Sequence, residues 1–434
     1  MSVNNPKLNN KYIDEIICIL KPYIYPENQK RSLRTNFTQA RELMQSLGSP
    51  QKNFKAIHIA GTSGKTSTAY YISSMLIQAG AKTGLSISPH VDNLTERIQV
   101  NGQPLKAGKF LVLLKRFMEL LKSKDIDAPG YFVLLYCFSI WALAELQVEY
   151  AVIETGMGGT FDATNVIDRS DKICIITDIG YDHVQLLGPT IRDIARHKAG
   201  IIHKGNSVFM YRQNPVINEE INRRIVQVGA ADIKFINSKI VNIPRVAEKL
   251  PLFQRRNWYL ALKAYTFIAD RDQLADLSPQ QQAVTVGIYI PGRMDITHIG
   301  RKTLIIDGAH NEQKLRILAA SVREQFRSEA ISLIFSINNH KQTDNLGAVI
   351  DLFSPEKVIL TAFNSDDYLR TKAADPAKLA ASLQCNTKHH HEVVVINSYH
   401  KALAEALNSS PDVIVISGSF FLISQIRQQL NQQN

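Results

Sequence analysis

The feature that most constrains this chain is a glycine-containing turn, GTSGKT at residues 61–66, which lies between two apolar segments. Residues 56–60 are typical of a short buried strand, and the segment after the turn places Ala69, Ile72 and Leu76 at helical spacing. Glycines allow backbone N–H groups to surround an anion, and a helix N-terminus adds partial positive charge. Lysine supplies a mobile cation, and threonine supplies a hydroxyl for Mg²⁺. The turn therefore predicts a phosphate-binding loop.

The loop is a short variant of the common pattern GxxxxGK[ST]. The position five residues before Gly64 is Ile59 and not glycine. An alternative interpretation is a Gly-Ser-Thr turn between a strand and a helix that binds nothing. We favour nucleotide binding because Gly64, Lys65 and Thr66 stand at the strand-to-helix junction where this chemistry requires them.

Length and cysteine content indicate a large globular protein of a reducing compartment. A chain of 434 residues suggests two or three domains, and 45% of its residues are hydrophobic. The four cysteines form no CxxC pair, which argues against a disulfide framework or a zinc site. The first residues contain no apolar core of signal-peptide length, and the apolar run at 131–144 is shorter than a membrane span. We expect a cytoplasmic protein in which residues 131–144 form a buried helix.

The formal net charge of +11 is compatible with nucleic acid, an anionic surface or small polyanionic substrates as partners. Lysine and arginine are dispersed, without the basic ribbon interleaved with aromatic residues that tracks single strands. We therefore expect small-molecule substrates, no nucleic acid and no membrane. The three histidines at 389–391 cannot all face one metal ion from a regular element, so a solvated loop is predicted there.

Apolar runs alternate with amphipathic segments along the chain, which is typical of an α/β fold with open sheets. Pro291-Gly292 interrupts this pattern and separates two sets of runs. We therefore predict two α/β domains, residues 1–290 and 291–434. The strand candidates are residues 56–60, 84–88, 150–154, 173–177 and 207–211 in the first domain, and 303–306, 331–335, 358–360, 393–396 and 413–416 in the second.

Polar side chains follow several of the predicted strands of the first domain. Ser88, Glu154 and His183 each stand at or just beyond the end of an apolar run. Ligands gather beyond the carboxyl ends of the strands in open α/β sheets, so these residues are expected to converge on the loop at 61–66. A hard cation that bridges phosphates takes oxygen ligands and tolerates an imidazole. Each residue taken singly has an alternative role as a cap, a salt-bridge partner or a structural group.

Seven sequence blocks carry a resemblance to a known family, and the resemblance covers the chain from about residue 40 to the C-terminus. They are HIAGTSGKTST at 58–68, SPHVDNLTERIQVNG at 88–102, EYAVIETGMGGTFDATNV at 149–166, ITDIGYDHVQLLG at 176–188, IARHKAGII at 194–202, PGRMDI at 291–296 and IIDGAHN at 305–311. In their order, spacing and residue identities, these blocks resemble those of the Mur-ligase superfamily, and within it the folylpolyglutamate synthase/dihydrofolate synthase branch. The resemblance implies an N-terminal P-loop ATPase domain with a mostly parallel sheet and a C-terminal Rossmann-like α/β domain.

The resemblance also implies the roles of individual residues. Lys65, Lys198 and His310 are implied to act in catalysis, and Lys198 matches a lysine that is carbamoylated in relatives and stabilises a second Mg²⁺. The alternative for Lys198 is an ordinary lysine on a helix surface. The implied ATP-binding residues are Gly61, Thr62, Ser63, Gly64, Lys65, Thr66, Ser67, Gln254, Asn257, Arg293 and Asp307. The implied metal ligands are Thr66, Ser88, Glu154 and His183, and the implied glutamate-binding residues are His310 and Ser419.

The activity implied by the resemblance is an ATP-dependent amide ligase. It would convert a folate-type carboxylate into an acyl phosphate and join L-glutamate to it, with release of ADP and phosphate. Magnesium, in two ions, and a monomeric state are implied as well. Closure of the two domains about residues 285–293 is expected to assemble the site. The alternatives are a ligase with another acceptor, such as a nucleotide-linked muramoyl peptide, and a nucleotide-binding protein without catalysis.

The chain departs from the folate branch at several points. The branch usually has GKGS in its loop, whereas this chain has Lys65-Thr66-Ser67, as the peptidoglycan ligases do. Residues 130–133 read GYFV in place of a TxFE-like stretch, and Asp92-Asn93 replaces an arginine that is common after SPH. Since these departures concern the acceptor region more than the ATP site, the identity of the acceptor stays open.

Overall fold

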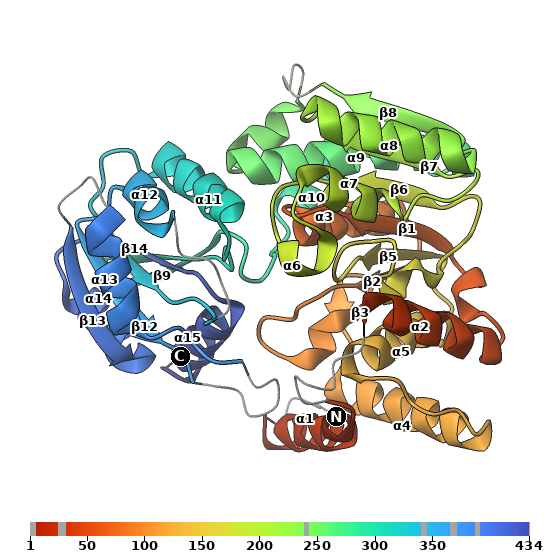
Figure 1. The fold of residues 1–434 in the computed structure, drawn as a ribbon, viewed down its shortest axis with the longest axis horizontal. Coiled ribbons are helices and arrows are strands. Elements are labelled where there is room, and N and C mark those ends of the chain that lie inside the picture. The colour runs from red at the N-terminus through yellow and green to blue at the C-terminus, as the bar shows by residue number, and fades with distance from the viewer. Residues whose placement is uncertain are drawn as a thin grey trace. The chain divides into compact units, whose positions relative to one another are not determined.

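The computed structural model describes residues 6–24, 32–237, 243–339, 345–364, 371–386 and 391–433. The chain forms two compact units (Figure 1). The first consists of Met1–Leu250 and Gln254–Ile288, and the second consists of Pro251–Phe253 and Tyr289–Asn434. The expected domain boundary at residues 290 and 291 stays a prediction.

A sheet of eight strands within the described residues forms the centre of the first unit, in the order β4-β3-β2-β5-β1-β6-β7-β8. Neighbouring strands from β2 to β8 in this order run parallel, whereas β3 pairs antiparallel with both β2 and β4 at one edge. The bounds are β1 Lys55–Ala60, β2 Thr83–Ser86, β3 Ile98–Val100, β4 Gln103–Pro104, β5 Tyr150–Glu154, β6 Ile173–Ile176, β7 Ser207–Tyr211 and β8 Asp232–Ile236. The central strands are buried and mostly apolar because helices cover both faces of a parallel sheet.

The helices of the first unit lie before, between and after these strands. They are α1 Pro6–Leu20, α2 Leu33–Ser46, α3 Lys65–Gln78, α4 Ala107–Ser123, α5 Tyr131–Glu145, α6 Val184–Leu187, α7 Ile191–Ala199, α8 Pro215–Val228, α9 Leu252–Asp272 and α10 Pro279–Val286, with 3₁₀ turns at Lys21–Tyr23, Pro50–Lys52, Leu94–Arg97, Ala163–Val166 and Arg245–Lys249. Helix α5 is apolar on nearly all sides and almost wholly buried, as is expected of a helix inside a large core. The buried helix predicted at 131–144 is therefore confirmed.

The second unit is a smaller α/β unit whose described residues form a six-stranded sheet in the order β13-β12-β11-β14-β10-β9. All neighbours are parallel except β9 and β10. The strands are β9 Asp295–Ile299, β10 Lys302–Ile306, β11 Ile331–Phe335, β12 Lys357–Ala362, β13 Glu392–Ser398 and β14 Val413–Ser417. The helices are α11 Glu312–Gln325, α12 Leu346–Ile350, α13 Pro376–Asn386, α14 Tyr399–Asn408 and α15 Phe420–Gln433, with a 3₁₀ turn at Asp351–Phe353.

The last strand of the second unit decides where its loops meet. Strand β14 returns from the far edge and inserts between β10 and β11. The carboxyl ends of β10 and β14 are therefore neighbours, and each leads into a helix, α11 or α15. In open sheets such a point, where the strand order reverses, is the usual place for a ligand.

The α/β class with mostly parallel sheets is confirmed, and each of the ten predicted strands is found with its ends within two residues. Strands β3, β4, β8 and β9 were not predicted, because they are short or carry polar residues at sheet edges. His389 and His390 lie outside the described residues. His391 contradicts the solvated-loop prediction, since its side chain is 3% exposed and its Nε2 lies 2.8 Å from Asp351 Oδ1. No helix among the described residues has the length and apolarity to span a bilayer.

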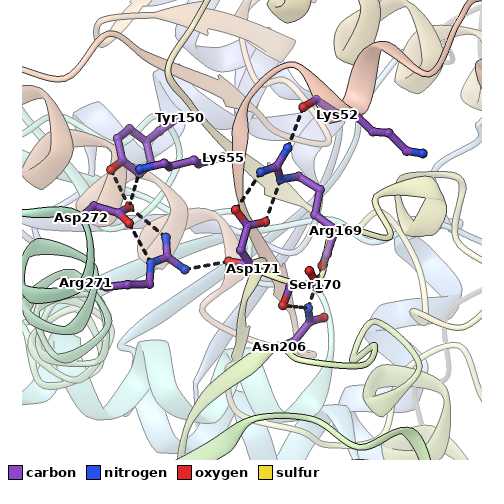
Figure 2. A network of polar contacts seen from close by, with 9 residues as sticks. All are labelled: Lys52, Lys55, Tyr150, Arg169, Ser170, Asp171, Asn206, Arg271 and Asp272. Atoms are coloured by element: carbon purple, nitrogen blue, oxygen red, sulfur yellow. Dashed lines mark hydrogen bonds and ion pairs between the residues drawn. The ribbon is translucent and has the colours of Figure 1, made fainter.

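A network of polar side chains joins the amino ends of the central strands of the first unit (Figure 2). Asp272, at the end of α9, accepts hydrogen bonds from the Tyr150 hydroxyl at 2.6 Å and from Arg271 at 2.9 Å, and it lies 3.3 Å from Lys55 Nζ. Arg271 also donates to the carbonyl of Asp171 just before β6. Since Lys55 and Tyr150 begin β1 and β5, this carboxylate ties α9 to the two central strands.

The environment of Asp272 predicts a pH-dependent contribution to stability. Burial alone would raise the pKa of Asp272, but hydrogen bonds from Arg271 and Tyr150 lower it to about 2. A lowered pKa stabilises the folded state fully above the unfolded pKa near 4, and this contribution is lost as the pH falls toward 2. Asp272→Asn should therefore lower the free energy of unfolding at pH 7 by about 1 kcal/mol, once solvent screening is allowed for.

Urea unfolding measured from pH 7 downward checks this prediction. The difference in the free energy of unfolding between the wild type and Asp272→Asn should become smaller below pH 4. Asp412→Asn is the matched control, because Asp412 pairs with Lys302 while 67% of its side chain is exposed. Asp412→Asn should lower the free energy of unfolding by less than about 0.5 kcal/mol. Equal effects of the two variants would contradict the role given to Asp272.

Candidate active site

The loop between β1 and α3 is tied to the end of the neighbouring strand β6. The backbone N–H groups of Thr62 and Ser63 donate to the carbonyl oxygen of Asp178, at 2.8 and 3.2 Å. The Thr62 hydroxyl donates to the carbonyl of Gly180 at 3.0 Å and accepts from its N–H at 3.1 Å. The start of the loop is thus held by the protein itself. The first N–H groups of an α-helix lack intrahelical acceptors as a rule, which makes the beginning of α3 suited to an anion.

Gly64 allows the loop to turn into α3 beside a residue of α9. Its φ of 89° belongs to the left-handed region, and a Cβ atom at this position would lie 2.4 Å from Asn257 Oδ1. One turn earlier in α9, Gln254 Oε1 accepts a hydrogen bond from the Tyr71 hydroxyl of α3 at 3.2 Å. The structure therefore brings Gln254 and Asn257 beside the loop at 61–66 and the helix α3 that follows it, and both residues are buried.

Lys198 lies beneath the same loop. Its Nζ donates to the carbonyl oxygen of Gly61 at 2.8 Å, and the residue is 4% exposed. Helix α7, which carries it, begins with a capping box in which Thr190 and Asp193 satisfy each other's backbone N–H groups. The alternative of an ordinary surface lysine is therefore wrong. Carbamoylation of Lys198 stays a prediction.

A buried carboxylate joins the loop to the end of a second strand. Glu154 ends β5 and is 2% exposed. Its carboxylate accepts hydrogen bonds from Thr66 Oγ1 at 2.9 Å and from the backbone N–H of Ser88 at 3.2 Å. Three of the four predicted metal ligands, Thr66, Ser88 and Glu154, are thus in direct contact. Their oxygens make a donor set that suits a hard cation such as Mg²⁺.

His183, the fourth predicted ligand, follows β6 and caps the short helix α6. Its backbone has a φ of 52°, and its N–H donates to Asp182 Oδ1 at 3.1 Å. Its Nε2 lies 3.9 Å from the same carboxylate oxygen, and 43% of its side chain is exposed. An accessible imidazole at the carboxyl edge of the sheet is compatible with a ligand role, which stays a prediction.

Asp307 is a buried acid of the second unit, at the carboxyl end of β10. Its two carboxylate oxygens accept hydrogen bonds from the N–H groups of Met294 and Ala309, each at 2.8 Å. Burial raises the pKa of Asp307, and the nearby guanidinium of Arg293 partly offsets this effect. The structure therefore brings the two predicted ATP-binding residues of this unit together.

An aromatic ring organises the other predicted residues of the second unit. Phe420 begins α15, and its ring lies 4.6 Å from the Arg293 guanidinium and 5.6 Å from the centre of the His310 ring, edge to face. His310 Nδ1 donates to the Gly308 carbonyl at 2.8 Å, since a carbonyl only accepts, and Nε2 lies 3.2 Å from Lys314 Nζ. A neutral imidazole with its proton on Nδ1 satisfies both contacts.

Ser419 lies beside this ring at the end of β14. Its hydroxyl donates to Asn338 Oδ1 at 3.0 Å and accepts from the N–H of Phe421 at 3.2 Å. The predicted glutamate-binding residues His310 and Ser419 therefore both lie at the neighbouring ends of β10 and β14. Their role stays a prediction.

Comparisons with known proteins agree with this architecture. Residues 293–431 match the family described as dihydrofolate synthetase, C-terminal domain. The chain is 30% identical over 416 residues to the protein of Schizosaccharomyces pombe named "Probable dihydrofolate synthetase", and the match covers 90% of this chain and 96% of that protein.

The chain belongs to the dihydrofolate synthase/folylpolyglutamate synthase family, a branch of the Mur ligases. A second member, the dihydrofolate synthase/folylpolyglutamate synthase of Bacillus subtilis, is 28% identical over 426 residues, which cover 92% of this chain and 96% of that protein. The structure of Mycobacterium tuberculosis folylpolyglutamate synthase complexed with ADP superposes with a TM-score of 0.82 at 25% identity, over 97% of this chain and 98% of that one. The predicted resemblance and fold are confirmed.

Several residues that contact the candidate site were not predicted from the sequence. Tyr136, Asp178, Phe420 and Lys314 contact predicted site residues, but none was singled out. Asp178 has a signal, since it stands in the block at 176–188 at the end of a strand. Tyr136 lies within an apolar helix and has no such signal, because its partner Ser88 is 48 positions away.

Two glycines provide a test of the predicted phosphate-binding loop. Gly64→Ala should weaken the binding of ADP at least about tenfold, because the loop must move to relieve the contact with Asn257. Gly80→Ala is the matched control, since Gly80 has a φ of 87° and a Cβ atom added there would meet no atom within 4 Å. Both should lose about 1 kcal/mol of stability. Calorimetric titration with ADP would contradict the prediction if the two variants bound equally well.

Proposed function

We propose that this protein is an ATP-dependent carboxylate–amine ligase that joins L-glutamate to a folate-type acceptor. The observation that carries the proposal is the contact of Thr66, Glu154 and Ser88 beside the phosphate-loop, in a chain of this family. A loop hydroxyl and a buried carboxylate in contact are what a Mg²⁺-bound nucleotide requires. The names of the relatives, dihydrofolate synthase and folylpolyglutamate synthase, support the acceptor class.

The reaction joins two groups that do not condense unaided. A carboxylate oxygen of the acceptor attacks the γ-phosphorus of ATP, the bond to the ADP oxygen breaks, and an acyl phosphate forms. The amino nitrogen of glutamate then attacks the acyl carbon, a proton leaves the nitrogen, and phosphate departs. Phosphoryl transfer depends mostly on positioning and charge neutralisation, so cationic side chains and N–H groups suffice and no protein nucleophile is needed.

The residues of the first unit are assigned to the nucleotide and the metal. Lys65 and the N–H groups at the start of α3 hold the phosphates, and Gln254 and Asn257 seat the nucleotide beside them. Thr66, Ser88, Glu154 and His183 would hold Mg²⁺, for which we propose two ions. When bound, Mg²⁺ supplies positive charge that neutralises the phosphate oxygens. The contact of Thr66 with Glu154 supports the direct use of the loop threonine.

The residues of the second unit are assigned to the nucleotide and to glutamate. Asp307 accepts two N–H groups and keeps lone pairs for ribose hydroxyls, while Arg293 serves the phosphates. His310 and Ser419 serve the incoming glutamate. Lys314 beside His310 adds a cation that a glutamate carboxylate would favour.

The acceptor is either dihydropteroate or a folyl mono- or polyglutamate. We further propose a monomer of the cytoplasm that works on small molecules, without nucleic acid or membrane as a partner. The dispersed positive charge, +11 over the whole chain, is suited to ATP and to polyanionic folates.

Phosphate release from ATP tests the proposed function. Release should require L-glutamate together with either dihydropteroate or tetrahydrofolate, and it should not respond to DNA or RNA. Lys65→Ala should keep the fold and lower turnover about a thousandfold, equivalent to about 4 kcal/mol of transition-state stabilisation. A folded variant with near-normal turnover would overturn the assignment of the loop. Phosphate release that does not depend on either acceptor would overturn the proposed acceptor class.

Lys198 provides a second test. Free ammonium would repel Mg²⁺, whereas a lysine that has reacted with CO₂ becomes an anionic oxygen ligand. Lys198→Ala should lose most activity and recover part of it in acetate or formate, which can occupy the place of the carbamate. Lys172→Ala is the matched control, since Lys172 is also buried and donates to a backbone carbonyl, that of Ile167 at 2.6 Å. Small carboxylates should not rescue it. Loss without rescue in Lys198→Ala would instead assign that lysine to holding Gly61.

A further inference from the structure

A buried phenol reaches the proposed metal site from the core of the first unit. Tyr136 lies in the middle of α5 and is 7% exposed. Its hydroxyl oxygen lies 2.5 Å from Ser88 Oγ, which is a short hydrogen bond. None of the site residues predicted from the sequence lies on α5.

The position of the phenol is fixed from two sides. The turn after β5 packs so closely on it that a Cβ atom at Gly156 would lie 2.2 Å from the Tyr136 hydroxyl oxygen. The ring belongs to the buried face of a helix whose neighbours Cys137 and Phe138 are fully buried. A group held in this way loses little further conformational entropy when it forms a hydrogen bond.

Ser88 has its backbone fixed by one partner and its side chain by another. Its N–H donates to Glu154 Oε2 at 3.2 Å, so the main chain is already placed against the buried carboxylate. The remaining freedom is rotation about χ1, which decides where the hydroxyl points. The contact with Tyr136 selects one of the three rotamers.

We propose that Tyr136 is a positioning residue that orients the Ser88 hydroxyl, so that its oxygen and not its proton is offered to the divalent cation. The inference rests on the proposed function, because it assumes the metal site at Thr66, Ser88 and Glu154. A serine that ligates a cation must direct its proton elsewhere. Either oxygen of the Ser88–Tyr136 pair can be the donor, and we assign the phenol oxygen as the acceptor of the serine proton.

Tyr136→Phe removes the hydroxyl and keeps the ring. Tyr265→Phe is the matched control, because Tyr265 is also buried and its hydroxyl donates to the Ala275 carbonyl, outside the proposed site. The binding of Mn²⁺ in the presence of ADP, followed by electron paramagnetic resonance, should be about tenfold weaker in Tyr136→Phe and unchanged in Tyr265→Phe. The concentration of Mg²⁺ for half-maximal turnover should rise by the same factor, with turnover at saturating Mg²⁺ within about twofold of the wild type.

A double-mutant cycle with Ser88→Ala tests whether Tyr136 acts through Ser88. Loss of the tyrosine hydroxyl should weaken Mn²⁺ binding no further once Ser88 is alanine. Additive losses, or Mn²⁺ binding in Tyr136→Phe equal to that of the control, would overturn the inference. If Tyr136→Phe does not fold, Ser88→Ala alone decides, and wild-type Mn²⁺ affinity in it would overturn the inference. Failure of the wild-type protein to bind Mn²⁺ with ADP would instead overturn the proposed function.

Discussion

The pairing of β1 with β5 on one side and with β6 on the other is the constraint on which the site depends. The register sets Ile59 opposite Glu154 and Ala60 opposite Ile176, so all three strands end at the loop that follows β1. A slip of one residue would turn the Glu154 side chain to the other face of the sheet. Because the strands are buried apolar runs, such a slip is opposed by the whole core, and the carboxylate is held against Thr66.

The polar groups at the two ends of the strands of the first sheet are satisfied in different ways. At the amino ends, Asp272 is surrounded by Lys55, Tyr150 and Arg271 in a network that the protein completes by itself (Figure 2). At the carboxyl ends, hydroxyls, N–H groups and a carboxylate come together beside a helix N-terminus. This is the arrangement that a phosphate and a hard cation require. The closed network holds the strands whose opposite ends carry the site.

In the second unit, the predicted site residues pack around the aromatic ring of Phe420. Phe420 contacts both Arg293 and His310, while Asp307 lies next to Arg293 and is satisfied by two N–H groups. A guanidinium packed on a ring face is partly desolvated and restricted in its rotamers, which favours a defined contact with an anion. The insertion of β14 beside β10 makes this possible, because Phe420 and His310 follow different strands.

The sequence by itself determined the α/β class, the glycine-containing loop between a strand and a helix, the buried helix α5 and the strands whose ends carry Ser88, Glu154, His183 and Asp307. These features depend on local spacing, which a linear pattern records. Only the tertiary structure decided which side chains meet, as for Lys198 with Gly61 and Tyr136 with Ser88, and it alone revealed the edge strands. Such contacts join residues far apart in the chain, and they depend on strand order, register and helix packing, which local periodicity does not contain.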